Sequence, residues 1–154
     1  MNFYSKVNPV IDKRINGLCL KSYPLHPKGC PNWNKKKGCP PNILSLNRII
    51  NFKKEIYIIY NKYNFKQHCN KMKERHPNWS KRQIECCLYW QGTARKQLKE
   101  KIKLFFKEFP NYYIIKCPEG SGVNLTETMK QLNIELEWPP INYAYQIILA
   151  GTKI

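Results

Sequence analysis

The sequence predicts a single α/β domain with a sheet of about four strands and flanking helices, including one long helix at about 81–109. β-branched and aromatic runs of strand length alternate with segments of helical periodicity, as in layered α/β folds. The chain has 154 residues, the usual size for one hydrophobic core, and no repeat or flexible linker divides it. Its hydrophobic fraction of 42% can fill such a core. We therefore expect one compact domain over 1–154.

Four segments have the composition of β-strands, which favour β-branched and aromatic residues. They are 14–23, 55–61, 111–116 and 143–151. In layered α/β folds, ligands collect in the loops beyond the carboxyl ends of strands. Cys117 follows the third segment directly, so we expect it in such a loop.

The long helix has the clearest start and stop signals. Ser80 and Gln83 form the pattern of a capping box, and Pro110 ends the segment. Apolar residues between them recur on one arc at 100° per residue, which places Cys87 in the core and Cys86 on the opposite face. Shorter helices are predicted from Asn42, over 65–75 and over about 125–132.

The formal net charge of +17 first indicates binding to nucleic acid. Only five of the 27 basic residues are arginine, although specific recognition of phosphates and bases favours the arginine fork. Together with many Asn and Ile residues, the lysine excess indicates a compositional bias. We expect weak, nonspecific and salt-sensitive affinity for nucleic acid before any specific binding.

The sequence also limits the compartment. No apolar run approaches the roughly 20 residues of a membrane span, and the first residues lack the apolar region of a secretory signal. We expect a cytoplasmic protein without membrane contact. In a reducing cytosol, seven cysteines indicate metal binding or catalysis more than disulfides.

Four cysteines form the candidate metal site: Cys19, Cys30, Cys39 and Cys117. Glycines and prolines beside them stiffen the loops and let the backbone approach closely. The paired C-x2-4-C of zinc sites and the compact ferredoxin run are both absent, so spacing alone leaves the metal open. The alternative is four ordinary buried thiols.

Two further residues are candidates near these cysteines. His26 precedes Cys30 by four residues and is either a replacement ligand in a Cys3His site or a plain loop residue. Glu119, two residues after Cys117, is the candidate catalytic residue. Its carboxylate fits a general base, a metal ligand or an acceptor behind a ligand, but equally a turn or helix-cap residue.

The loop GCPNWNKKKGCPPN resembles the signature of a small cysteine-rich family of predicted metal-binding proteins, in which GCPN and CPP follow an early cysteine. A later patch agrees, with Cys117-Pro118 before a helical segment that contains Glu127 and Met129. The resemblance covers about 14–140. The first cysteine gap is longer than in the family, and the family's second group of cysteines is reduced to Cys117. The resemblance therefore implies one metal site.

Three functions remain open from the sequence. The first is an iron–sulfur protein with a [4Fe–4S] cluster. If three cysteines bind the cluster, one iron stays open for Lewis-acid chemistry. If Cys117 is the fourth ligand, the cluster serves electron transfer or structure. The second is a small binding module with a structural zinc site. The third is a basic accessory protein associated with nucleic acid. Whether the protein is an enzyme, and its substrate or redox partner, stay open.

Overall fold

The computed structural model describes residues 2–21, 27–37 and 39–154. Its centre is a four-stranded sheet in the order β1-β2-β4-β3, and every neighbouring pair is antiparallel. The strands are β1 (Tyr4–Lys6), β2 (Tyr57–Asn64), β3 (Tyr113–Ile115) and β4 (Tyr143–Gly151). The predicted four-stranded sheet with flanking helices is thus confirmed.

The antiparallel sheet overturns one part of the sequence reasoning. In a parallel sheet the carboxyl ends of all strands meet at one edge, whereas in an antiparallel sheet they alternate between both ends. The rule that ligands collect at the carboxyl ends therefore does not apply here. The position of Cys117 has to be judged from its actual neighbours.

The predicted strand at 14–23 is wrong. Its described part forms the 3-10 helix η1 (Lys13–Leu20). Asp12 caps this helix, because its side chain accepts a hydrogen bond from the Arg14 N–H at 3.0 Å. Gly17 within it disfavours a strand. The sheet takes its remaining strand instead from Tyr4–Lys6, which is too short to give a periodic signal.

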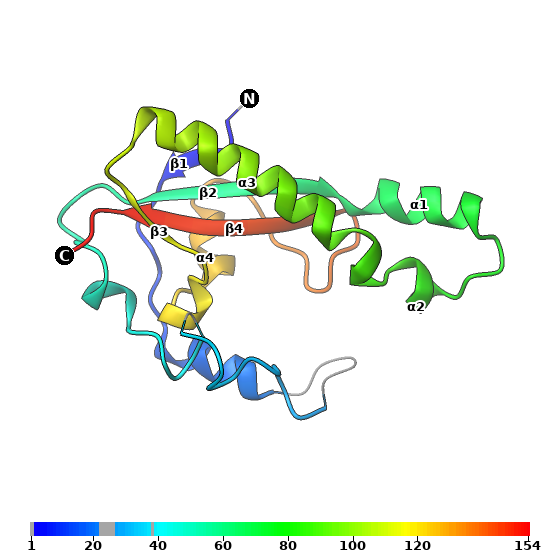
Figure 1. Ribbon diagram of the computed structural model, residues 1–154, viewed down its shortest axis with the longest axis horizontal. Helices are drawn as coiled ribbons and strands as arrows, with labels where there is room; N and C mark the ends of the chain where they lie inside the picture. Colours follow the sequence, from blue (N-terminus) through cyan, green and yellow to red (C-terminus); the bar gives the residue numbers. More distant parts are fainter. Residues whose placement is uncertain (1, 22–26, 38) are drawn as a thin grey trace.

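The sheet is covered on both faces (Figure 1). Helix α3 (Gln91–Glu108) crosses one face, where Phe105 is fully buried against Tyr57 and Ile59 of β2. Helix α4 (Leu125–Lys130) and the long N-terminal region cover the other face. The larger core on that side consists of Val7, Leu46, Ile50, Ile56, Ile58, Ile115, Val123, Leu125, Met129 and Leu149.

The long helix starts ten residues later than predicted. The capping box at Ser80 is present, but it opens only the short helix α2 (Lys81–Ile84), which the 3-10 turn η3 (Cys87–Tyr89) separates from α3. Trp90 explains the break. Its ring is buried beside Tyr63 and Phe65, and its indole N–H donates to a carbonyl oxygen of the preceding turn at 3.2 Å.

Cys87 is consequently exposed, so its predicted place in the core is wrong. Helix α1 (Phe65–Arg75) forms over the predicted 65–75, and α4 begins where a helix was expected. The helix predicted from Asn42 is absent from the described structure. A single 3-10 turn, η2 (Leu46–Arg48), replaces it and buries Leu46.

A polar layer interrupts the packing between α3 and the sheet. Asn61 of β2 is only 2% exposed, and its amide donates to Gln146 Oε1 at 2.8 Å. The side-chain oxygen of Asn61, Oδ1, accepts a hydrogen bond from Lys101 Nζ at 2.7 Å, and burial lowers the pKa of Lys101. The layer separates two apolar clusters of the α3 side.

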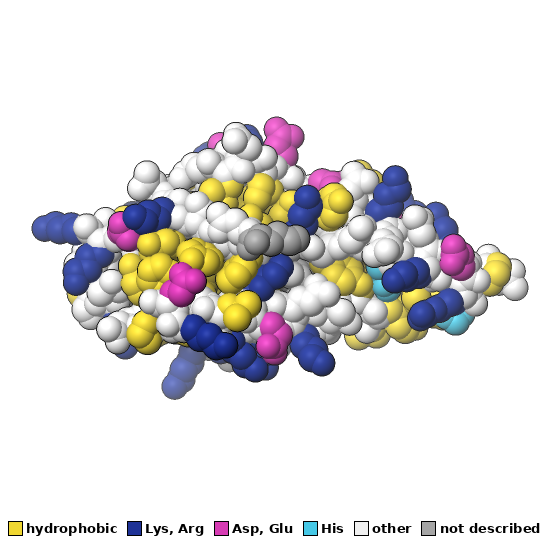
Figure 2. All heavy atoms as spheres, turned by 90° about the horizontal axis from the view of Figure 1, so that it is seen from above, with side chains coloured by type: hydrophobic (Ala, Val, Ile, Leu, Met, Phe, Trp, Pro, Cys, Tyr) yellow, Lys and Arg dark blue, Asp and Glu magenta, His cyan; other side chains and the backbone are white. Residues whose placement is uncertain are grey.

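On the α3 side, basic side chains occur along the whole length of the molecule, with acidic side chains and apolar areas between them (Figure 2). None of the described helices combines the length and the apolar character that a membrane crossing requires.

Candidate metal centre

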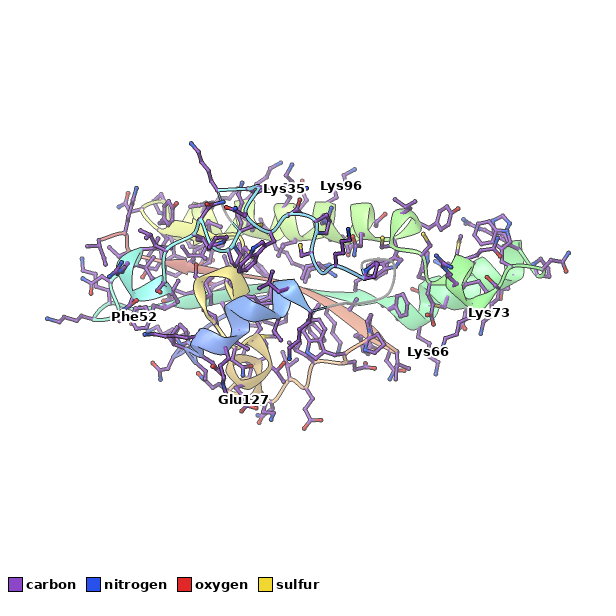
Figure 3. All side chains as sticks on the ribbon, turned by 90° about the horizontal axis from the view of Figure 1, so that it is seen from below. Lys35, Phe52, Lys66, Lys73, Lys96 and Glu127 are labelled. Carbon is purple, nitrogen blue, oxygen red and sulfur yellow. The ribbon has the colours of Figure 1, made fainter. Side chains whose placement is uncertain are left out.

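The described residues of the loop that carries Cys30 and Cys39 form tight turns; Lys35 of this loop is labelled in Figure 3, which views the side opposite α3. Gly29, directly before Cys30, has a φ of 87°, a conformation that glycine adopts without strain. The Asn34 N–H donates to the Pro40 carbonyl oxygen at 2.8 Å, and Pro40 is fully buried. These contacts anchor the loop, whose described residues contain neither helix nor strand.

Cys117 leads into a second tight turn, the 3-10 helix η4 (Glu119–Ser121). Gly122 ends this turn in the left-handed conformation with a φ of 88°. Burial raises the pKa of the Cys117 thiol, and the backbone N–H of Gly120 in this turn offsets only part of that rise.

The N-terminal region is tied to this turn. The Asp12 N–H donates to the Gly122 carbonyl oxygen, and the Asn124 N–H donates to the Val10 carbonyl oxygen, both at 2.7 Å. Helix η1 therefore packs against η4. The backbone of Cys19 belongs to η1, while its side chain lies outside the described part of the structure.

Two of the predicted cysteines act on a third, Cys117. Burial is the main cause that raises the pKa of Cys117, and the nearby charges of Cys39 and Cys30 raise it further. Positions 78 and 87 residues apart along the chain are therefore electrostatic neighbours. Within the described residues, however, no three His, Cys, Asp or Glu side chains are arranged as a metal-binding group.

Glu119 also lies in this region. Surrounding protein atoms raise the pKa of the Glu119 carboxyl group by displacing water, although by accessible surface the residue is exposed. The charge of Glu119 in turn contributes to the raised pKa of Cys117, so the two groups are close. A carboxyl group held beside a thiol fits the predicted roles of Glu119 as well as a plain turn residue.

Sequence reasoning missed Ser121. Its hydroxyl is buried, with the residue 1% exposed, and it has no hydrogen-bond partner among the described residues. An unpaired buried hydroxyl costs free energy and calls for an explanation. A serine within the local sequence PEGSGVN gives no signal of this kind, because burial here depends on the packing of η4 against η1.

The remaining candidates lie elsewhere. Cys69 is half-buried on α1, and burial raises its pKa. Cys86 and Cys87 lie near α2, at the end of the molecule that carries α1 (Figure 1). The predicted alternative ligand His26 lies outside the described residues. All cysteines whose side chains are described are free thiols.

Comparisons with known proteins assign no family: no family description matches the chain, and neither a curated protein nor a solved structure resembles it significantly. The resemblance to the cysteine-rich family stays a prediction.

Proposed function

We propose that this chain is a metal-binding protein whose centre is held by the thiolates of Cys19, Cys30, Cys39 and Cys117, with a [4Fe–4S] cluster as occupant. The observation that carries the proposal is the closeness of Cys117 to the cysteine loop. Cys117 lines one cavity with Lys37 and Asn42, which flank Cys39 along the chain, and the charges of Cys39 and Cys30 act on its thiol. When bound, such a cluster supplies electron transfer if four thiolates ligate it, or an open iron as a Lewis acid if three do.

The donor set fits this occupant. Thiolates are the ligands of iron–sulfur clusters, and their affinity depends on the deprotonated form. Burial and the charges of Cys39 and Cys30 raise the pKa of Cys117 and so disfavour its thiolate form. A bound cation reverses this balance, because it compensates the thiolate charges that repel one another. A reducing cytoplasmic location, as predicted, keeps these cysteines available.

The buried Ser121 hydroxyl, four residues after Cys117, has no partner among the described residues. Thiolate sulfurs accept hydrogen bonds with either metal, so this hydroxyl does not separate a cluster from a zinc ion. Zinc held by the same four cysteines is the alternative outcome of the test below. A nucleic-acid function has less support, since on the α3 side basic, acidic and apolar side chains are interspersed (Figure 2).

The test is metal analysis of protein purified without oxygen from cells supplied with both iron and zinc. About four irons and four sulfides per chain, with a broad visible charge-transfer band, support the proposal. One colourless zinc per chain identifies the alternative occupant. Protein that holds neither metal contradicts the metal-binding function.

Cysteine variants assign the ligands. Cys30→Ser and Cys39→Ser are expected to lose the bound metal, because each removes a thiolate from the centre. Cys87→Ser is the matched control, since it removes an exposed thiol near α2 and is expected to keep the metal. If Cys30→Ser and Cys39→Ser retain full metal content, the proposed ligand set is wrong.

A further inference from the structure

A cavity of about 630 Å³ adjoins the candidate metal centre, because Cys117 lines its wall. It lies where the chain after the cysteine loop meets β3 and the C-terminal residues, at the end of the molecule opposite α1 (Figure 1). Ligand pockets commonly have volumes of about 300–1,000 Å³. The cavity is therefore large enough for a small molecule beside the thiol.

The charge around this cavity has one sign. Four basic residues line it: Lys37, Arg48, Lys116 and Lys153. No Asp or Glu of the described residues belongs to the lining. None of the four takes part in the ion pairs of the described residues, which all lie elsewhere. The Lys153 ammonium group has the Tyr113 ring as a neighbour, 5.2 Å from the ring centroid. Like charges around a concavity raise the local concentration of an ion of opposite charge.

The rest of the wall is aliphatic. Six side chains contribute: Ile43, Leu44, Ile49, Ile114, Ile115 and Ile154. Leu44 is 53% exposed, so apolar surface faces solvent at this cavity. Among the described residues Tyr113 is the only aromatic one in the lining, and one ring is a poor stacking platform for the bases of a nucleic-acid strand.

We propose that this cavity binds a small amphiphilic anion, with a carboxylate or phosphate head held by the basic residues and an aliphatic body against the isoleucines and Leu44. The inference deepens the proposed function, because it names the substrate class of the same site and rests on Cys117 as a ligand of the centre. The body of the molecule buries apolar surface that is now exposed, and its head compensates four cations. Cys117 would then lie beside the bound molecule.

The test uses the full chain and two probes, octanoate and octyl phosphate. Backbone amide chemical shifts are followed by NMR while each probe is added, with octanamide as the uncharged match of octanoate. We expect saturable shifts at Ile43–Ile49 and Tyr113–Cys117 with at least one anion, and about tenfold weaker binding of octanamide. Equal binding of octanoate and octanamide would show that charge is not recognised, and would overturn the inference.

Paired lysine variants separate the cavity from the overall charge. Lys116→Gln/Lys153→Gln removes two cations from the cavity and is expected to weaken binding of the anion about tenfold. Lys73→Gln/Lys96→Gln is the control with the same net charge, and Lys73 lies at the far end of the molecule from Phe52 (Figure 3). Equal weakening in both double variants indicates nonspecific attraction and refutes the cavity. Absence of saturable shifts with both anions refutes it as well.

Metal content distinguishes this inference from the proposed function. Both measurements are made on the same anaerobic preparation. Saturable anion binding in protein that holds no metal supports the cavity and contradicts the metal centre. Bound metal without anion binding supports the metal centre and contradicts the cavity.

Discussion

Gly151 at the end of β4 is a site where one added methyl group should destabilise the fold measurably. A Cβ atom at this position would lie 2.8 Å from Ile50 Cδ1, 3.2 Å from Ile50 Cβ and 3.3 Å from Ile50 Cγ2. Ile50 is fully buried. Rotation of its side chain can move Cδ1, but its Cβ is fixed by the backbone, whose N–H donates to the Leu46 carbonyl oxygen at 3.0 Å.

The magnitude follows from two opposing effects. Overpacking a core by one methyl group costs about 1–3 kcal/mol of the free energy of unfolding. Replacing glycine by alanine also restricts the unfolded chain, which returns about 0.4–1 kcal/mol. We therefore expect Gly151→Ala to destabilise the protein by about 1–2 kcal/mol.

Urea denaturation of a double-mutant cycle tests this reasoning. Ile50→Val removes the closest atom, Cδ1, and alone costs about 0.5–1.5 kcal/mol. Combined with Gly151→Ala it should cost about 1 kcal/mol less than the sum of the single variants. Gly92→Ala is the control, since nothing lies within 4 Å of its added Cβ, and it should stabilise α3 by up to about 1 kcal/mol. Additive costs, or a Gly151→Ala variant as stable as the parent, would refute the steric argument.

Two more predictions concern polar groups. Asn61→Leu should lower the free energy of unfolding by about 1–3 kcal/mol, because it leaves the Lys101 ammonium group without its acceptor. Adding Lys101→Met should recover part of this loss in the same denaturation assay. If Lys101→Met recovers nothing, the hydrogen bond is not what the single variant lost. Backbone N–H groups of Asn142, Tyr143 and Ile141 lower the pKa of Glu137. Its contribution to stability is therefore complete above the ordinary glutamate pKa of about 4.3. That contribution is lost as the pH falls through the lowered pKa. The free energy of unfolding of Glu137→Gln should therefore fall less steeply below about pH 4.3 than that of the parent, and parallel pH curves would exclude this role.

Local signals predicted those parts of the fold that local interactions determine. Helix α1, the start of α4 and strand β4 agree with their periodicity and composition, and the Ser80 capping box forms, with the Ser80 N–H donating to Gln83 Oε1 at 2.8 Å. Prediction from the sequence failed where contacts between distant residues determine the local structure. Burial of Trp90 interrupts the long helix, and this burial depends on side chains of β2 and α1 that no local pattern can indicate.

The candidate centre was predictable only in part. Cysteines beside glycine and proline indicated Cys30, Cys39 and Cys117, and in the structure the charges of the first two act on the third. The neighbourhood itself arises from long-range backbone pairing, such as Asp12 with Gly122, which has no signal in the sequence. The buried Ser121 and the basic residues around the adjoining cavity depend on the same distant contacts.

The place of β4 in the sheet affects how the protein folds during synthesis. This strand lies between β2 and β3 and pairs with β2 along eight residues, yet it comprises residues 143–151. Synthesis therefore has to pass residue 151 before the sheet can close. Until then β2 exposes an unpaired, apolar edge, and pairings over such sequence distances form slowly. A nascent chain that stalls before residue 143 is expected to aggregate or to require a chaperone.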